Sequence, residues 1–124
     1  MTASVKDAVI MPAGAGELVD RGPGVRTWPL VTVANGAMEF LTGITEFDAG
    51  ASLQFHFHNC QESIVVLEGV ANFETSHGTR VLHASDATLV PAELVHRFLN
   101  RGPDRLRILY IYGSTQATRT IVDR

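Results

Sequence analysis

Alternation of apolar and polar residues is the clearest pattern in this chain. It is sharpest in the segment RLRILYIY at residues 105–112, where every second residue belongs to the same face. Successive side chains of a β-strand point to opposite sides of the sheet. One face carries Arg105 and Arg107 together with Leu109 and Ile111, and the arginines mark it as outward. We therefore expect the other face to point into the protein; it holds Leu106, Ile108, Tyr110 and Tyr112.

Short segments of this kind recur from residue 30 onward and are separated by turn signals such as Asn35-Gly36 and Gly102-Pro103. A helical period never persists for three turns, and the tail QATRTIVDR is readable either as a short helix or as a strand. Regular short strands with turns between them are typical of an all-β sandwich or barrel. The expected strands cover 30–33, 37–47, 52–58, 62–68, 70–75, 79–82, 87–90, 95–100 and 105–112.

The chain is long enough for one domain with a single core, since it has 124 residues. Residues 11–29 are rich in Gly and Pro. We therefore predict an N-terminal arm with loops over 1–29 and a β-barrel domain over 30–124.

Composition excludes several classes of partner. The net charge is −3 and no long basic run occurs, so we expect no nucleic acid partner. No apolar run approaches 18 residues, which argues against a membrane span, and the N-terminus lacks the apolar core of a signal peptide. The lone Cys60 cannot form an internal disulfide. These features fit a cytoplasmic protein.

The stretch QFHFHNCQES at residues 54–63 holds two histidines on one strand face and a glutamate four residues later. Side chains two apart on a strand lie about 7 Å from each other, so His56 and His58 can converge on one ion. Glu62 can return on the neighbouring strand, and His96 would complete three nitrogens and one carboxylate. Such a set suits one divalent transition metal ion, whether Fe, Mn, Ni, Cu, Co or Zn.

The full spacing is longer than the histidine pair. It reads Gly50-x5-His56-x-His58-x3-Glu62-x6-Gly69 and, later, Ser85-Asp86-x4-Pro91-x-Glu93-x2-His96-x3-Asn100. This pattern resembles the two motifs of the cupin superfamily. The first motif is matched at every specified position. The second is matched at Pro91, His96 and Asn100 and departs from it at Ser85 and Glu93, where glycine is usual.

The resemblance implies a cupin-type β-barrel, a double-stranded β-helix or jelly roll, whose metal is held by His56, His58, Glu62 and His96. A non-glycine residue with positive φ costs about 1 kcal/mol. We expect Ser85 and Glu93 to alter their turns and to leave the ligands intact. A role for Glu93 at the mouth of the cavity is the alternative to a turn residue. Asn100 is expected to close a turn or to tie strand ends together.

Further residues are candidates for the walls of the site. Gln54 precedes His56 by two residues and is either a group that orients substrate or a hydrogen-bonded barrel glutamine. Gln54 and Glu62 are the candidate catalytic residues. The expected cavity is largely aromatic and aliphatic, with no Arg or Lys cluster facing inward. Its predicted lining residues are Met38, Phe40, Ile64, Phe98, Tyr110 and Tyr112, although core packing alone would also explain them.

Two classes of function remain open. The first is an enzyme that acts on a small, largely apolar oxygenated molecule through open metal positions. Dioxygenase-like chemistry is favoured for this enzyme, and a non-redox isomerase, lyase or cyclase is the alternative. The second is a non-catalytic module that binds metal or ligand. Leu109 and Ile111 place apolar side chains on an outward face, which favours a homodimer.

Overall fold

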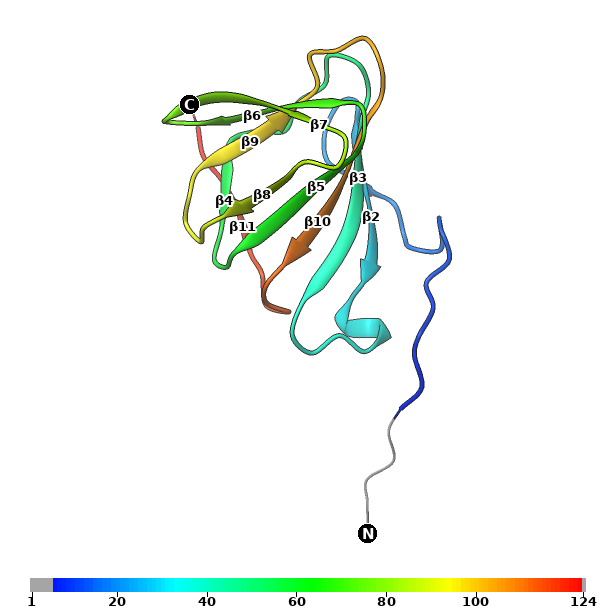
Figure 1. Ribbon diagram of the computed structural model, residues 1–124. Helices are drawn as coiled ribbons and strands as arrows, with labels where there is room; N and C mark the ends of the chain where they lie inside the picture. Colours follow the sequence, from blue (N-terminus) through cyan, green and yellow to red (C-terminus); the bar gives the residue numbers. More distant parts are fainter. Residues whose placement is uncertain (1–5, 124) are drawn as a thin grey trace.

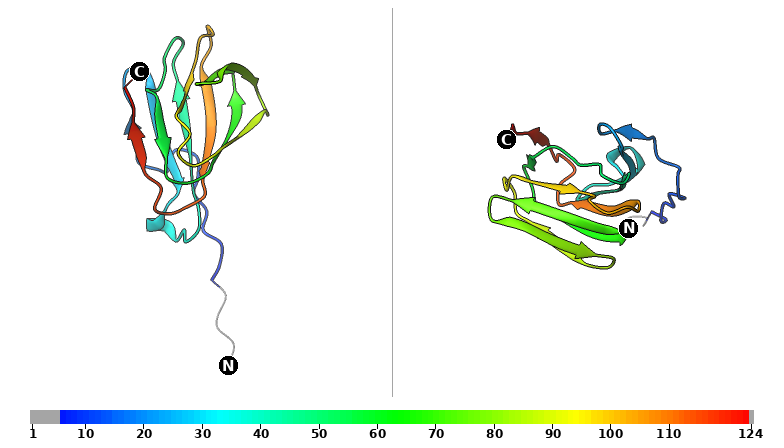
Figure 2. Two further views of the ribbon diagram at one scale, coloured as in Figure 1. Left: turned by 90° about the vertical axis from the view of Figure 1, so that its left-hand side faces the viewer. Right: turned by 90° about the horizontal axis from the view of Figure 1, so that it is seen from above.

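The computed structural model describes residues 6–123 and shows two antiparallel β-sheets packed face to face (Figures 1 and 2). The described residues contain one short 3-10 helix, η1 (Val33–Asn35), and no helix among them is long and apolar enough to cross a membrane. The strands are β1 (Val19–Asp20), β2 (Val25–Val31), β3 (Leu41–Phe47), β4 (His56–His58), β5 (Glu62–Glu68), β6 (Val70–Thr75), β7 (Gly78–His83), β8 (Ala87–Val90), β9 (His96–Leu99), β10 (Leu106–Tyr112) and β11 (Arg119–Ile121).

Strand order explains how distant motifs meet. One sheet has six strands in the order β1-β2-β3-β10-β5-β8, and the other has five in the order β11-β4-β9-β6-β7. The first histidine strand, β4, therefore lies between β9 and β11 and pairs His56 with His96. This arrangement confirms the predicted all-β jelly roll.

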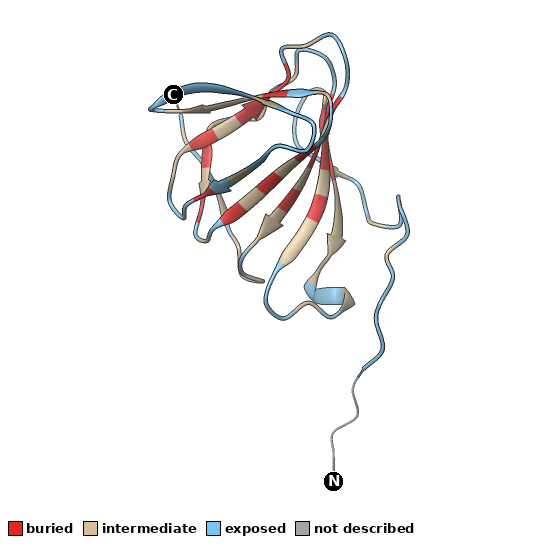
Figure 3. Cartoon of the chain, viewed as in Figure 1, coloured by how far each residue is buried: buried red, intermediate tan, exposed pale blue. Residues whose placement is uncertain are grey.

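The core lies between the sheets, and burial alternates along the strands as expected (Figure 3). Leu106 and Ile108 on β10 are fully buried, as the alternation at 105–112 predicted, and they pack with Phe47 and Phe98 in one cluster. Burying a side chain of this size contributes about 1.5–3 kcal/mol. The cluster therefore holds the two sheets together beneath the site.

Tyr110 depends on a glycine in the neighbouring strand. The register of β10 and β3 places Tyr110 opposite Gly43. A Cβ at Gly43 would overlap the Tyr110 ring, so only glycine leaves room for that ring. This contact determines which residues of β3 face inward. They are Gly43, Thr45 and Phe47.

The predicted boundary at residue 30 is wrong. It falls inside β2, and β1 and most of β2 lie within the segment that was expected to be arm and loops. The many Gly and Pro residues of this segment hid the alternation of Val25 and Thr27, which are both buried. Pro29 marks an irregularity in the β2–β3 register, where a proline is tolerated because the ladder is already interrupted. Among the described residues, the arm proper covers 6–18, before β1.

The two departures from the cupin motif coincide with strained turns. Ser85 has φ 78° and Glu93 has φ 70°, and they are the two non-glycine residues with positive φ in the part of the chain described. The chain thus keeps the left-handed conformation that glycine adopts at lower cost. The Glu93 amide donates a hydrogen bond to the His58 carbonyl at 2.8 Å, which ties this turn to the histidine strand.

Replacing Glu93 with glycine should relieve this strain. Both Glu93→Gly and Glu93→Ala remove the carboxylate, but only glycine adopts positive φ freely. Part of the gain is offset by the greater freedom of glycine in the unfolded chain. We expect Glu93→Gly to be more stable than Glu93→Ala by about 0.5–1 kcal/mol in urea unfolding with an unchanged m value. An alanine variant as stable as the glycine variant would contradict the argument.

Candidate metal centre

Three strands bring the predicted ligands together. His56 and His58 lie on β4, Glu62 begins β5, and His96 begins β9. The four side chains are buried, with between 0% and 4% of each residue exposed. The imidazole rings contact one another in tilted or edge-on arrangements, with ring centroids 4.5–5.6 Å apart. One candidate ligand atom from each histidine lies within 4.8 Å of the others.

Each imidazole is oriented by a main-chain carbonyl. The Nδ1 atoms of His56, His58 and His96 lie 2.8–2.9 Å from the carbonyl oxygens of Gln54, Thr118 and Leu94. A carbonyl only accepts hydrogen bonds, so each Nδ1 must carry the proton and donate it. In a neutral ring the Nε2 atom then has a free lone pair. This fixed tautomer is the usual arrangement of metal-binding histidines.

Glu62 adds a carboxylate to this set. Its Oε1 atom lies 3.2 Å from Nε2 of His96 and 3.4 Å from Nε2 of His58. Burial acts to raise the pKa of Glu62, but the contacts with His58 and His96 outweigh it and hold the pKa below its usual value. Burial lowers the pKa of His56 to about 3, so that ring is neutral at physiological pH.

These contacts fit a bound cation. A neutral imidazole with Nδ1 protonated points a lone pair at a carboxylate oxygen that also offers only lone pairs. Such a contact is favourable only with a proton or a positive ion between the atoms. The Nε2 atom of His58 is buried with no hydrogen-bond partner among the described residues. Three imidazole nitrogens and a carboxylate therefore could hold a divalent transition metal, and several metals accept this donor set.

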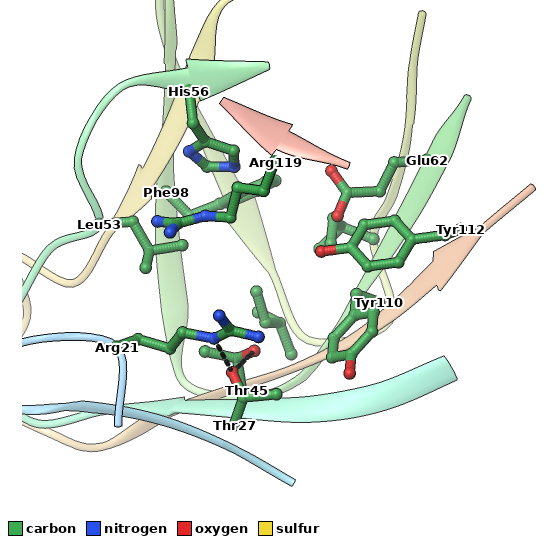
Figure 4. Close-up of a pocket in the computed structure, with 12 residues that line it drawn as sticks. Arg21, Thr27, Thr45, Leu53, His56, Glu62, Phe98, Tyr110, Tyr112 and Arg119 are labelled. Atoms are coloured by element: carbon green, nitrogen blue, oxygen red, sulfur yellow. Dashed lines mark hydrogen bonds between the residues drawn. The ribbon is translucent and has the colours of Figure 1, made fainter. Parts of the chain in front are cut away.

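A narrow cavity borders the centre through His56 and Glu62 (Figure 4). Its free space is about 30 Å³, enough for about two waters by the usual volume criterion. The Tyr112 ring packs against His58 with centroids 4.7 Å apart, and burial raises the pKa of both Tyr110 and Tyr112, which stay protonated. The lining residues are Arg21, Thr27, Thr45, Leu53, His56, Glu62, Ile64, Phe98, Ile108, Tyr110, Tyr112 and Arg119.

Four of the predicted wall residues, Ile64, Phe98, Tyr110 and Tyr112, do line this cavity. Met38 and Phe40 do not, and that prediction is wrong. They are 86% and 48% exposed and precede β3, which begins at Leu41. The parity of β3 also points even-numbered residues outward, because Tyr110 covers Gly43.

The prediction that Gln54 faces the site is also wrong, because it too extended strand alternation beyond the end of a strand. Its side chain is exposed and does not line the cavity, so a catalytic role for that side chain is not supported. The prediction extended strand alternation back from His56, but β4 begins at His56, and Ser52 forms only an isolated bridge. The irregular backbone turns Leu53 toward the cavity instead. Only the carbonyl of Gln54 serves the site.

Glu93 and Asn100 have structural roles. Glu93 is exposed in its turn and is absent from the cavity lining, which leaves its role to the backbone. Asn100 is buried, and its side-chain amide donates to the carbonyls of Phe47, Asp48 and Asp104 at 2.7–3.3 Å. It therefore ties strand ends together, as predicted.

Two arginines were missed. The expected absence of inward-facing Arg is wrong, because Arg21 and Arg119 both line the cavity (Figure 4). Arg21 follows the short β1 in the Gly/Pro-rich segment, where no periodicity points to it. Arg119 lies on β11, in the tail that was equally readable as a helix. The β-branched residues of TRTIV at 118–122 were the available signal for that strand.

Solved structures of other proteins share this architecture. The structure resembles the polyketide cyclase RemF from Streptomyces resistomycificus, with 20% identity, a TM-score of 0.79, and coverage of 97% of this chain and 87% of that chain. It also resembles an oxalate oxidase, with 20% identity and a TM-score of 0.73 over 82% of this chain and 57% of that one. At such identities the likeness shows the fold alone.

The chain is also similar in sequence to "Polyketide synthase CurC" from Streptomyces cyaneus, with 30% identity over 91 residues, or 73% of this chain. It spans 58% of the length of that curated protein.

Removing one imidazole tests the metal centre. We expect His58→Ala to lower the metal content of protein loaded with zinc(II) or iron(II) at least about tenfold, because a ligand should matter no less than the groups that orient it. His77→Ala is the matched control, since His77 is exposed in a turn. Elemental analysis gives the occupancy. Full occupancy in His58→Ala would refute the assignment.

The family follows from the sequence match that covers the site. Residues 43–112 match the family described as "Cupin domain", and this range includes His56, His58, Glu62 and His96. The match covers more than half of the chain, and the two-sheet fold agrees with it. The chain belongs to the cupin family.

Proposed function

We propose that the protein is a metal-dependent enzyme that cyclises a small substrate with several carbonyl groups, of the polyketide type. The observation that carries this proposal is the convergence of three imidazole Nε2 atoms and one carboxylate beside a cavity that also presents a tyrosine hydroxyl. Support for the substrate class comes from two similar proteins, one named a polyketide synthase and the other a polyketide cyclase.

The metal, when bound by these residues, would supply positive charge that polarises a substrate carbonyl. Glu62 lines the cavity as a carboxylate and is positioned to accept a proton from a carbon between two carbonyl groups. The carbanion so formed attacks a ketone carbon of the same molecule, and a carbon–carbon bond closes the ring. The Tyr112 hydroxyl points into the cavity and is positioned to donate a proton to the resulting alkoxide (Figure 4).

The remaining walls suit an apolar carbon skeleton. Leu53, Ile64 and Phe98 face the same cavity and would pack against the substrate and exclude water. Holding a flexible chain in one folded pose is a large part of what a cyclase must do. These apolar side chains, together with the polar groups of the same cavity, fit the predicted class of small oxygenated substrates.

An oxygenase is the second candidate. Three histidines and a carboxylate are also a suitable set for iron, which activates oxygen in many proteins. A dioxygenase-like activity and a cytoplasmic location stay predictions.

Cyclisation and oxygenation can be distinguished by varying the bound metal and the presence of air. We expect protein loaded with zinc(II) to convert aryl-substituted triketones to cyclised products without air, measured by absorbance and by the mass of the product. Tyr112→Phe should lower kcat by about 10²-fold or more if its hydroxyl supplies the proton. Tyr110→Phe is the control, because the Tyr110 hydroxyl is directed away from Glu62 in Figure 4.

Other outcomes decide against cyclisation. Oxygen uptake with iron(II) alone would favour the oxygenase. Tight binding of the triketones without turnover under either condition would leave a non-catalytic binding module.

We also propose a homodimer formed through the outer face of the six-stranded sheet. Leu109 and Ile111 are half-buried on this face, and Trp28, Leu30 and Ile44 line a hollow beside Met11 of the arm. An apolar face of this extent favours association. In the structure, that part of the arm borders the outer face of its own chain.

Light scattering tests the dimer. We expect a species of twice 13.4 kDa at micromolar concentration, shifted toward monomer by Leu109→Glu because a charge would be buried at the interface. Val81→Glu is the control, since Val81 is 54% exposed on the other sheet. A 13.4 kDa species alone in the unsubstituted protein would contradict the proposal.

A further inference from the structure

Two arginines reach the same cavity from opposite sheets. Arg21 directly follows β1, which is an edge strand of the six-stranded sheet, and Arg119 begins β11, an edge strand of the five-stranded sheet. Both side chains line the cavity, and Figure 4 shows both guanidinium groups beside it; Arg21 is exposed at the cavity mouth and Arg119 is half-buried. The fold thus brings together two positive charges that are 98 positions apart in the sequence, from 21 to 119.

Neither guanidinium has an ion pair within residues 6–123. Arg21 has a long contact of 3.4 Å from Nε to the Thr27 hydroxyl, which in turn shares a hydrogen bond with Thr45 at 2.9 Å. Four other arginines do pair with carboxylates: Arg26, Arg97, Arg105 and Arg107. Arg80 and Arg101 also lack an ion pair in the described residues, but neither lines the cavity, so Arg21 and Arg119 are distinguished by having unpaired donors at the cavity.

Two like charges that converge on a half-enclosed space repel each other unless an anion lies between them. The carboxylate that lines this cavity is Glu62, and it is already in contact with His58 and His96. The planar guanidinium presents its donors in a fork that matches a carboxylate or a phosphate. The pair therefore selects an oxyanion from the ligand, and a carboxylate, the smaller of the two, fits the narrow cavity better.

We propose that Arg21 and Arg119 form a carboxylate-binding subsite beside the metal centre, so that the substrate is an organic acid with an apolar body. This inference rests on the proposed function, whose substrate it narrows. The acid group binds the two arginines, the apolar body lies against Leu53 and Phe98, and the carbon between two carbonyl groups faces Glu62.

The small free volume of the cavity requires side chains to move when a ligand enters, and the arginines are suited to this movement. With about 30 Å³ of free space, a ring-sized ligand must displace side chains to enter. Arginine side chains are long and have many rotamers, so Arg21 at the mouth and the half-buried Arg119 are suited to moving outward while keeping contact with the acid.

Binding of simple aromatic acids to zinc-loaded protein tests the subsite without requiring turnover. The probes are benzoate and 2-naphthoate with their methyl esters, titrated by calorimetry. We expect each acid to bind more tightly than its ester, and Arg21→Gln and Arg119→Gln each to weaken acid binding about tenfold or more. Ester binding should change little. Added salt should weaken binding of the acids more than that of the esters.

Arg80→Gln is the matched control, since it removes the same charge from an exposed position on β7 outside the cavity. Zinc content and melting temperature are measured for every variant, so that loss of metal or of fold is recognised. Unchanged acid affinity in both cavity variants would overturn the subsite and place the carboxylate on the metal. Equal affinity for acid and ester, or no acid binding at millimolar concentration, would also overturn it.

The binding experiment distinguishes a failure of the subsite from a failure of the cyclase proposal. A preference for acids that depends on Arg21 and Arg119 stands even if no triketone is converted. Conversely, turnover of neutral triketones together with unchanged acid affinity in both arginine variants would support the cyclase and reject the subsite.

Discussion

The need to satisfy buried polar side chains constrains this fold most strongly. Three imidazoles and a carboxylate lie almost fully buried between two sheets that are otherwise held by apolar packing. A buried polar group without a partner costs about 1–3 kcal/mol, so each must find one. Each imidazole has two ring nitrogens, and main-chain carbonyls accept hydrogen bonds from the Nδ1 atoms. The Nε2 atoms, which face one another and Glu62, are satisfied well only by a cation.

This constraint links the metal centre to parts of the chain that are far away in sequence. The carbonyl that orients His58 belongs to Thr118, and the next residue, Arg119, pairs with His58 in the β4–β11 ladder. One short strand therefore both fixes a metal ligand and carries a cavity arginine. The strained turn at Glu93 serves the same strand from the other side, because its amide binds the His58 carbonyl. The hydrogen bond from the Glu93 amide to the His58 carbonyl helps to hold the turn at Glu93 in its strained conformation.

Sequence alone was sufficient where spacing and alternation act together. The strands at 62–68, 70–75 and 87–90 have the predicted bounds, and the four ligand candidates meet as their spacing implied. It failed where alternation was extended beyond a strand, as at Gln54 and Met38, since parity has meaning only within a continuous ladder. It also failed for Arg21, because a loop residue reaches a cavity through the path of the backbone in space. No local pattern encodes that path.

The charged side chains around the cavity determine which ligands it favours. The sequence had predicted a largely apolar cavity instead. One carboxylate, Glu62, faces two guanidinium groups, and a divalent ion bound by the histidines would add further positive charge. Such an enclosed positive field favours ligands that carry negative charge and stabilises negative charge that develops during reaction. An acid with neighbouring carbonyl groups meets both conditions, since its carboxylate is anionic at rest and its enolate is anionic in the reaction. Under the proposed function, the same electrostatics would serve both recognition at Arg21 and Arg119 and carbanion formation near Glu62.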